Sequence, residues 1–183
     1  IQGFPSCEEY PYLVAEAGSP TYMLFNTDSW VPGDAPTFEC GVASNTHTQT
    51  IIPALYEQDF VINVSVPKVH EAAGYTGSIK NTYGCTYRCI LTHGNDPSEG
   101  APGVTSCLPE FYRSQDAVTP CVVNILDALG ILYDGSGAHY GSYGAPKKIA
   151  ASRDPVMLDT YGLDLINAYR RQNGLHDVLI SDS

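Results

Sequence analysis

The pattern of apolar and polar positions along the chain predicts a series of short strands. The run from Phe60 to Val66 places Phe60, Ile62, Val64 and Val66 on one face by the two-residue period of a strand, and we expect that strand to be buried. Four other short apolar runs also predict strands, at residues 21–25, 38–43, 131–133 and 148–151.

Helix boundaries are marked by capping residues and prolines. Thr119 and Pro120 have the form of an N-cap and a first helical residue, and an apolar stripe then runs to Gly130, so we predict a helix there. Asp154 and Pro155 begin a second predicted helix that ends near Gly174. Shorter helices are predicted at residues 11–18 and 53–56, and a long surface loop at residues 92–106.

Helices that alternate with short apolar strands indicate an α/β fold. We expect three layers, with a mostly parallel sheet flanked by helices, in a single domain covering residues 1–183. The length of 183 residues and the 43% apolar content are sufficient for one hydrophobic core.

The charge balance argues against two classes of partner. Nine Lys and Arg residues against 20 Asp and Glu residues give a formal net charge of −11, which repels nucleic acid and anionic membranes. No run of about 18 apolar residues predicts a membrane span. The first residues lack the basic start and apolar stretch of a signal peptide, and since Ile1 is not Met we expect an upstream segment.

Six cysteines, an even number, are present without any C-x-x-C spacing, which argues against zinc and thioredoxin-type sites. Few lysines and many Tyr, Gly, Thr, Ser and Asn residues are typical of an exported protein, so we predict an extracellular or periplasmic location and at least two disulfides. Cys85–Cys89 and Cys107–Cys121 are the pairs we suggest. Buried free thiols are the alternative. The cysteines are Cys7, Cys40, Cys85, Cys89, Cys107 and Cys121.

Polar residues that follow the predicted strands form a candidate site. Lys68, His70 and Lys80, the candidate catalytic residues, come after the strand that ends at Val66. Ligands bind at the carboxyl edge of open α/β sheets, and these cationic donors would favour a carboxylate or phosphate. The candidate ligand-binding residues are Asn81, Asp134, Gly135 and Asp154. The two aspartates could also bind a divalent cation.

Each of these residues also has a structural interpretation. Asp154 before Pro155 is a preferred helix N-cap, and Asp134-Gly135 is a common turn sequence. Lys80-Asn81 could belong to a solvated loop. The tyrosine-rich run at residues 135–144 lacks the ending of a phosphate-binding P-loop, so a flexible aromatic loop is the better interpretation.

An ordered set of short motifs resembles the family catalogued as domain of unknown function 362. The set comprises Val61-Ile62-Asn63-Val64 with Pro67-Lys68-Val69-His70, Ser78-Ile79-Lys80-Asn81 with Tyr83-Gly84, Asp134-Gly135, Gly144-Ala145-Pro146, and Ala151-Ser152-Arg153-Asp154-Pro155-Val156 with Asp159. The resemblance covers residues 50–172 and matches the second half of the family domain.

The resemblance implies a fold and candidate residues but no reaction. Family members usually begin with a further βα segment, which is expected to be missing here, and many carry a ferredoxin-type module whose cysteine spacing this chain lacks. An iron–sulfur cluster is therefore not supported, and the cofactor is unknown.

Two function classes follow. The first is a structural or assembly-forming protein, in which self-association or an associated N-terminal fragment covers the sheet edge left by the missing segment. The second is an enzyme or binding domain for a small anionic metabolite, with or without metal assistance, that uses the Lys, His and Asp residues at the strand ends.

Overall fold

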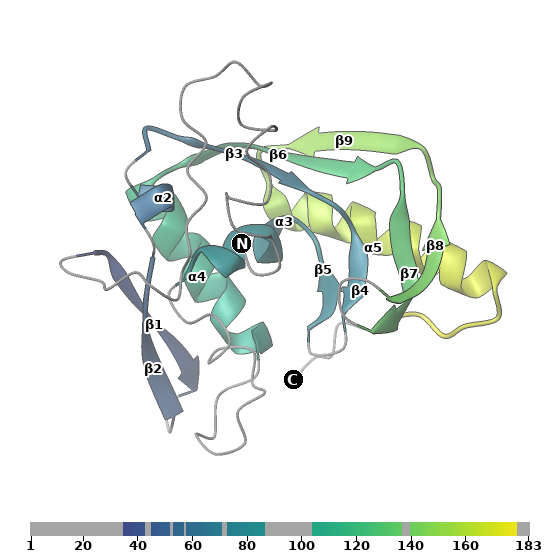
Figure 1. Ribbon diagram of the computed structural model, residues 1–183, viewed down its shortest axis with the longest axis horizontal. Coiled ribbons are helices and arrows are strands. Elements are labelled where there is room, and N and C mark those ends of the chain that lie inside the picture. Colours follow the sequence, from purple (N-terminus) through teal and green to yellow (C-terminus); the bar gives the residue numbers. More distant parts are fainter. Residues whose placement is uncertain are drawn as a thin grey trace, which may run out of the picture.

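The computed structural model describes residues 35–42, 45–51, 53–56, 58–70, 73–86, 104–136 and 140–178. Two sheets at the top and right of Figure 1 form its centre. The three-stranded sheet has the order β3-β6-β9, formed by β3 (Val61–Ser65), β6 (Cys121–Ala128) and β9 (Lys148–Ser152). The four-stranded sheet has the order β5-β4-β7-β8, formed by β4 (Lys68–His70), β5 (Gly74–Thr76), β7 (Ile131–Ser136) and β8 (Tyr140–Gly144).

Three short connections join the two sheets. Only two residues separate β3 from β4 and β6 from β7, and only three separate β8 from β9. Each strand of the three-stranded sheet is therefore linked directly to a strand of the four-stranded sheet. Pro67 lies in the first connection, where a residue without an N–H group interrupts the ladder at no cost in hydrogen bonds.

The C-terminal helix α5 (Pro155–Gln172) packs against strands of both sheets, β6, β7 and β9 (Figure 1). The Asp154 side chain accepts hydrogen bonds from the backbone N–H groups of Val156 and Met157, which confirms the predicted N-cap. Buried Ile166 of α5 packs with Val69, Ala128, Ile131 and Leu132, residues of β4, β6 and β7.

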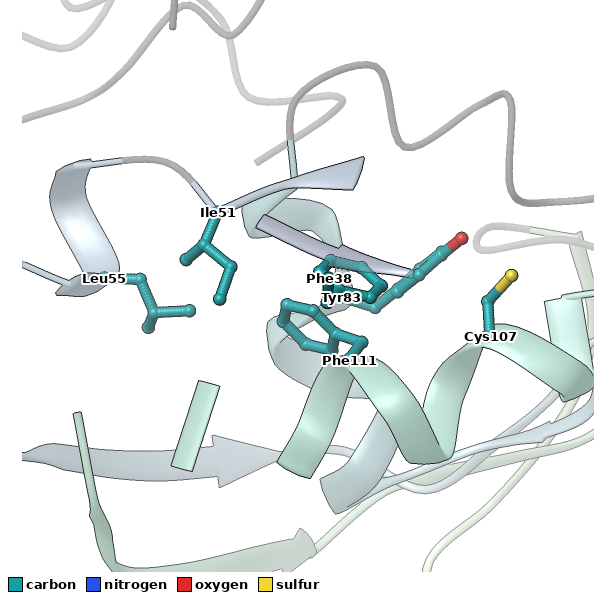
Figure 2. Close-up of a cluster of buried hydrophobic side chains, with 6 residues drawn as sticks. All are labelled: Phe38, Ile51, Leu55, Tyr83, Cys107 and Phe111. Atoms are coloured by element: carbon teal, nitrogen blue, oxygen red, sulfur yellow. The ribbon is translucent and has the colours of Figure 1, made fainter. Parts of the chain in front are cut away.

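A second core lies beside α4 (Val104–Val118), on the other side of the molecule (Figure 1). Figure 2 shows its six buried residues: Phe38, Ile51, Leu55, Tyr83, Cys107 and Phe111. They come from β1 (Thr37–Val42), the bridge residue after β2 (Asn45–Thr50), α2 (Pro53–Tyr56), η1 (Thr82–Cys85) and α4. Phe111 contacts the rings of both Phe38 and Tyr83, with centroids 5.6 Å apart in each pair.

The predicted helix from Thr119 to Gly130 is wrong, because Cys121–Ala128 is the central strand β6. Its burial alternates, with Asn124, Leu126 and Ala128 inside, and it is rich in β-branched residues, which favour strands. The helix in this region of the chain is α4, which ends at Val118, just before the predicted helix would begin. Pro109 lies inside α4, and an internal proline ordinarily argues against a helix.

The α/β class is confirmed, but the sheets are mixed rather than mostly parallel. Among the described strands, β3–β6 and β4–β7 pair in parallel, whereas β1–β2, β4–β5, β6–β9 and β7–β8 are antiparallel. Short connections rather than helical crossovers join β4 to β5 and β7 to β8, and strands joined in this way pair antiparallel. Most of the tyrosine-rich run at 135–144 belongs to the β7–β8 hairpin rather than to a loop.

The two faces of β3-β6-β9 have opposite character. The inner face, toward α3 (Ser78–Asn81) and α5, buries Asn63, Ser65 and Asn124. The outer face carries Ile62 and Val64 from β3, which are each 54% exposed, and Ile149 from β9, which is 66% exposed. Strand β3 was predicted correctly, but its apolar residues are exposed. The described helices α3 and α5 both lie on the inner face of β3-β6-β9.

Candidate functional site

Lys68, His70 and Lys80 gather around the β4–β5 hairpin. In this antiparallel pair Lys68 lies opposite Thr76, and His70 lies opposite Gly74. Residues opposite one another, or two apart on one strand, share a face, so Lys68, His70 and Thr76 lie on the same side of the hairpin. Lys80, on α3, extends its Nζ to within 3.4 Å of Thr76 Oγ1. The structure therefore places the three predicted residues on or beside one hairpin.

The His70 ring is oriented by its own loop. Its Nδ1 accepts a hydrogen bond from the backbone N–H of Ala73, at 3.3 Å. A ring nitrogen that accepts carries no proton, so the neutral tautomer of His70 holds its proton on Nε2. Gly74 lies directly across the hairpin from His70.

The two predicted aspartates lie at opposite ends of α5. Asp134 Oδ1 pairs with Arg170 Nη1 at 3.3 Å in the last turn of the helix, whereas Asp154 is the N-cap. Sixteen residues of helix separate Asp154 from Arg170, about 24 Å along the axis. One small ligand could not contact both carboxylates, so the structure does not bring them to a common point.

The remaining candidate residues have structural roles. Gly135 has φ 127°, a backbone conformation that favours glycine. Among the described residues, no group of three His, Cys, Asp or Glu side chains has the arrangement of a metal site. Asp134 is thus explained by its ion pair with Arg170, and Asp154 by its cap.

Two buried asparagines, Asn63 and Asn124, and the exposed Asn81 form a hydrogen-bonded network that the residue types alone did not reveal. Asn63 Nδ2 donates to Ser78 O and to Asn124 Oδ1, both at 2.8 Å. Asn63 Oδ1 accepts from Asn81 Nδ2, also at 2.8 Å. Both donors and the acceptor of Asn63 are therefore used, and the network ties α3 to β3 and β6. The predicted ligand residue Asn81 is a member of this network.

Asn81 also protects the free edge of β3. Its Nδ2 donates a second hydrogen bond, at 2.9 Å, to the backbone carbonyl of Val64. Among the described strands, β3 lies at the edge of the three-stranded sheet, where unpaired carbonyls invite another strand. One of these carbonyls is already occupied by the Asn81 amide.

Asp159 of α5 holds the start of α3. Its carboxylate accepts from the backbone N–H groups of Ser78 and of Ile79, the latter at 3.0 Å. Burial raises the pKa of Asp159, and the two backbone hydrogen bonds partly oppose that shift. Beside it, burial and the Asp159 charge raise the pKa of Tyr75, whose hydroxyl is buried without a hydrogen-bond partner.

The suggested pair Cys107–Cys121 is wrong, because Cys121 is a free thiol. Its Sγ lies 3.5 Å from both Val123 O and Asn124 Oδ1, at the end of the asparagine network. Cys107 is fully buried in the core of Figure 2. The side chains of Cys7, Cys40, Cys85 and Cys89 lie outside the described residues, as do the predicted helix at 11–18 and strand at 21–25.

No helix in the described part of the chain is long and apolar enough to cross a membrane. Comparison with curated proteins and with solved structures gave no match. A family model does match, over residues 7–164, and so begins well before residue 50, where the motif resemblance starts. That match covers most of the chain, which therefore belongs to the family described as "Domain of unknown function (DUF362)".

Proposed function

We propose that this chain is an assembly-forming domain that self-associates through the outer face of β3-β6-β9. The observation that carries the proposal is the exposure of large apolar side chains on this one face. Phe60, Ile62 and Val64 are each 54% exposed, Val66 is 47% exposed and Ile149 is 66% exposed. Single exposed apolar residues are common, but a contiguous group marks an interaction surface.

Strand register makes these residues contiguous. Ile62 lies beside Val123 and Val64 beside Ile125 across the β3–β6 pair, and Ile125 lies beside Ala151 across β6–β9. Asp127 is the one charged residue at these positions, and its carboxylate accepts a hydrogen bond from the nearby Leu129 N–H. The face is therefore an apolar surface nearly free of charge.

A second copy is the occupant we favour, because two such faces complement each other across a two-fold axis. Two sheets packed face to face bury their apolar residues in a layer about 10 Å thick. The patch exposes on the order of several hundred Å² of apolar surface, which is at the low end for specific interfaces. We therefore expect a dimer that dissociates at micromolar concentration.

The outer face suits association better than the free edge of β3 does. Asn81 occupies the Val64 carbonyl that an added strand would need. The net charge of −11 on each copy opposes association at long range, and salt screens that repulsion. An apolar contact between acidic copies should therefore tighten as ionic strength rises, whereas an interface held by ion pairs would weaken.

The test is light scattering coupled to gel filtration, from about 1 to 100 µM, an interval that brackets a micromolar dissociation constant. Wild-type protein should shift from a 19.7 kDa monomer toward twice that mass. Ile62→Glu should remain monomeric, because association would bury an unpaired carboxylate. Met157→Glu is the matched control: Met157 is 64% exposed but lies on α5, which covers the inner face, so this variant should dimerise normally.

A wild-type protein that stays monomeric at every concentration would overturn self-association. An amino-terminal fragment or another protein that co-purifies with the wild type but not with Ile62→Glu would replace the second copy with a different partner. Equal weakening by both substitutions would place the contact elsewhere.

An extracellular or periplasmic location also remains part of this proposal, supported by the surface composition and the even number of cysteines. Alkylation of protein isolated without reductant, followed by mass measurement, tests it. Cys121 should be modified once the protein is denatured, and at least two disulfides should survive among the other cysteines. Six modified thiols would contradict the proposed oxidising location.

A further inference from the structure

We infer that the free edge of β9 binds an acidic, extended peptide as an added strand. Such a site is independent of the proposed self-association, because it uses the backbone edge of the three-stranded sheet rather than its outer face. Three observations support it. Strand β9 is an edge strand, its surroundings are exposed, and the residues at both of its ends are cationic in a strongly acidic protein.

Strand β9 has backbone groups available for pairing. Among the described strands, it forms the second edge of the three-stranded sheet, and it pairs with β6 from Lys148 to Ser152. In an antiparallel pair every second residue bonds to the neighbouring strand, and the residues between direct their N–H and C=O groups to the other side. Within the described part of the chain, no backbone hydrogen bond links β9 to a strand other than β6. A further strand could therefore bond to this edge.

The two edges of this sheet differ in their protection. At β3, the Asn81 amide occupies the backbone carbonyl of Val64. At β9, the Ser152 hydroxyl accepts from the Asp154 N–H, a contact beyond the end of the strand that leaves the β9 backbone untouched. Strand β9 lies above β6 in Figure 1, and Ile149 in its middle is 66% exposed. Of these two edges, β9 is thus the more accessible.

Cations flank β9 at both ends. Lys147 and Lys148 lie at its start and Arg153 follows its end, and all three are exposed. Three of the nine Lys and Arg residues therefore fall within a short stretch, residues 147–153, that contains no Asp or Glu. Among the described residues, none of the three forms an ion pair, and this holds for Asp127, across from Ile149 on β6, as well. The edge is a locally basic region on an acidic protein.

Charge selects the kind of strand that this edge accepts. Two β9 strands from different copies, paired antiparallel about Ala150, would bring Lys148 of each copy close to Arg153 of the other, so that like charges repel. A strand with carboxylates at both ends would instead place one near Lys148 and one near Arg153, which are about 17 Å apart in an extended chain. Nucleic acid has no peptide groups to continue the sheet, and the net charge of −11 repels it. An acidic peptide is therefore the partner that fits both the backbone and the charge.

Fluorescence anisotropy of a labelled synthetic peptide at low ionic strength tests this site. The probe is Glu-Glu-Val-Thr-Val-Thr-Glu-Glu with blocked ends, whose β-branched centre favours an extended chain. Wild-type protein should bind it, and added salt should weaken the binding. Replacing every Glu of the probe by Gln should lower the affinity by about 3- to 100-fold, as expected for the loss of several exposed ion pairs.

A second probe separates strand addition from charge attraction alone. The same peptide with its central residues N-methylated keeps every carboxylate but loses the backbone donors that an added strand needs. We expect it not to bind. If it binds as tightly as the unmodified probe, the contact is one of charge only and strand addition is overturned.

Variants of the protein locate the contact. Lys148→Gln/Arg153→Gln removes one cation at each end of β9 and should lower the affinity for the acidic probe by about 2- to 30-fold. Arg113→Gln/Arg171→Gln is the matched control, because it removes the same number of charges from α4 and from the end of α5. Its affinity should stay within about twofold of the wild type, since distant surface charges contribute little.

Ile62→Glu should bind the probe as the wild type does, because it changes the outer face and not the β9 edge. Loss of self-association without loss of peptide binding would therefore keep the two proposals apart. The inference is overturned if the wild type does not bind the acidic probe at millimolar concentration, if the Gln peptide binds equally well, or if the two double variants weaken binding equally.

Discussion

The inner and outer faces of β3-β6-β9 differ in a way that inverts the usual relation between polarity and burial. On the inner face Asn63, Ser65 and Asn124 are between 0 and 2% exposed, while Ile62 and Val64, on the same strand as Asn63, are each 54% exposed on the outer face. The buried amides are tolerated because their donors and acceptors are paired with one another and with α3.

This difference shows what each face does. A satisfied polar network is directional, so the inner face fixes where α3 sits on the sheet, at the cost of the apolar contacts that an ordinary core would provide. The outer face makes few contacts of its own within the described chain. We therefore expect it to contribute little to the stability of the monomer, and the proposed self-association would cover its apolar residues.

Removal of the Asn63 side-chain amide should have the largest effect on the free energy of unfolding. Asn63→Ala leaves Asn124, Ser78 and Asn81 without their partner, and we expect the free energy of unfolding to fall by about 2–4 kcal/mol. Urea denaturation at low protein concentration measures it. Ile62→Ala, the adjacent outer-face control, should cost less than about 1 kcal/mol, as is usual for a half-exposed position. Equal costs would remove the distinction between the faces.

Adding a methyl group at Gly162 should cause the next largest loss in the free energy of unfolding. A Cβ there would collide with the Tyr75 hydroxyl and lie 3.1 Å from Leu126 Cδ2, so we expect Gly162→Ala to cost about 1–3 kcal/mol. Tyr75→Phe removes the hydroxyl, which has no hydrogen-bond partner, and should recover part of the loss in the double variant. Additive effects in the double-mutant cycle would contradict this packing of α5 against the hairpin.

The buried carboxyl of Asp159 should give a smaller, pH-dependent effect. Its pKa is raised in the folded protein, so the native state binds this proton more tightly than the unfolded state. The stability contributed by Asp159 should therefore decrease as the pH rises from its ordinary value of 3.8 to the raised folded value. Asp159→Asn removes this titration. The difference in unfolding free energy, wild type minus variant, should fall across that interval, and a rise would show that the pKa is lowered instead.

The smallest effect on stability is expected at the centre of the outer face. Val64→Thr keeps a β-branched side chain of similar shape, so the unfolding free energy of the monomer should change by less than about 0.5 kcal/mol. The added hydroxyl would be buried on association, and the dimer dissociation constant should increase severalfold. Sedimentation equilibrium measures that constant, and an unchanged value would exclude Val64 from the contact.

Local signals predicted much of this structure correctly. Asp154 and Pro155 identified the start of α5, and the two-residue period grouped Phe60 with Ile62, Val64 and Val66. Periodicity states which residues share a face but not which face is buried. That choice depends on Ser78 and Asn124, whose hydrogen bonds to Asn63 come from residues distant in sequence.

The errors have similar causes. The predicted helix at 119–130 was based on Thr119, Pro120 and Gly130, which are typical of helix ends. The valines and isoleucine between them favour a strand, and this stretch forms β6. For the site, Lys68 and His70 lie on β4 and Lys80 contacts Thr76 of β5, so all three lie on or beside one hairpin, as expected for residues near in sequence. Asp134 and Asp154 lie at opposite ends of α5, because their relation depends on the direction of that helix, which the sequence pattern does not specify.

Methyl NMR of isoleucine-labelled protein with a soluble paramagnetic agent tests the central claim most directly, because it reports the exposure of each face. Ile166 is fully buried within the monomer and provides the internal standard. At dilute concentration the methyl groups of Ile62 and Ile149 should be strongly relaxed by the agent, and at high concentration they should become nearly as protected as Ile166. Strong relaxation of both methyl groups at every concentration would contradict an outer face that is covered by a second copy.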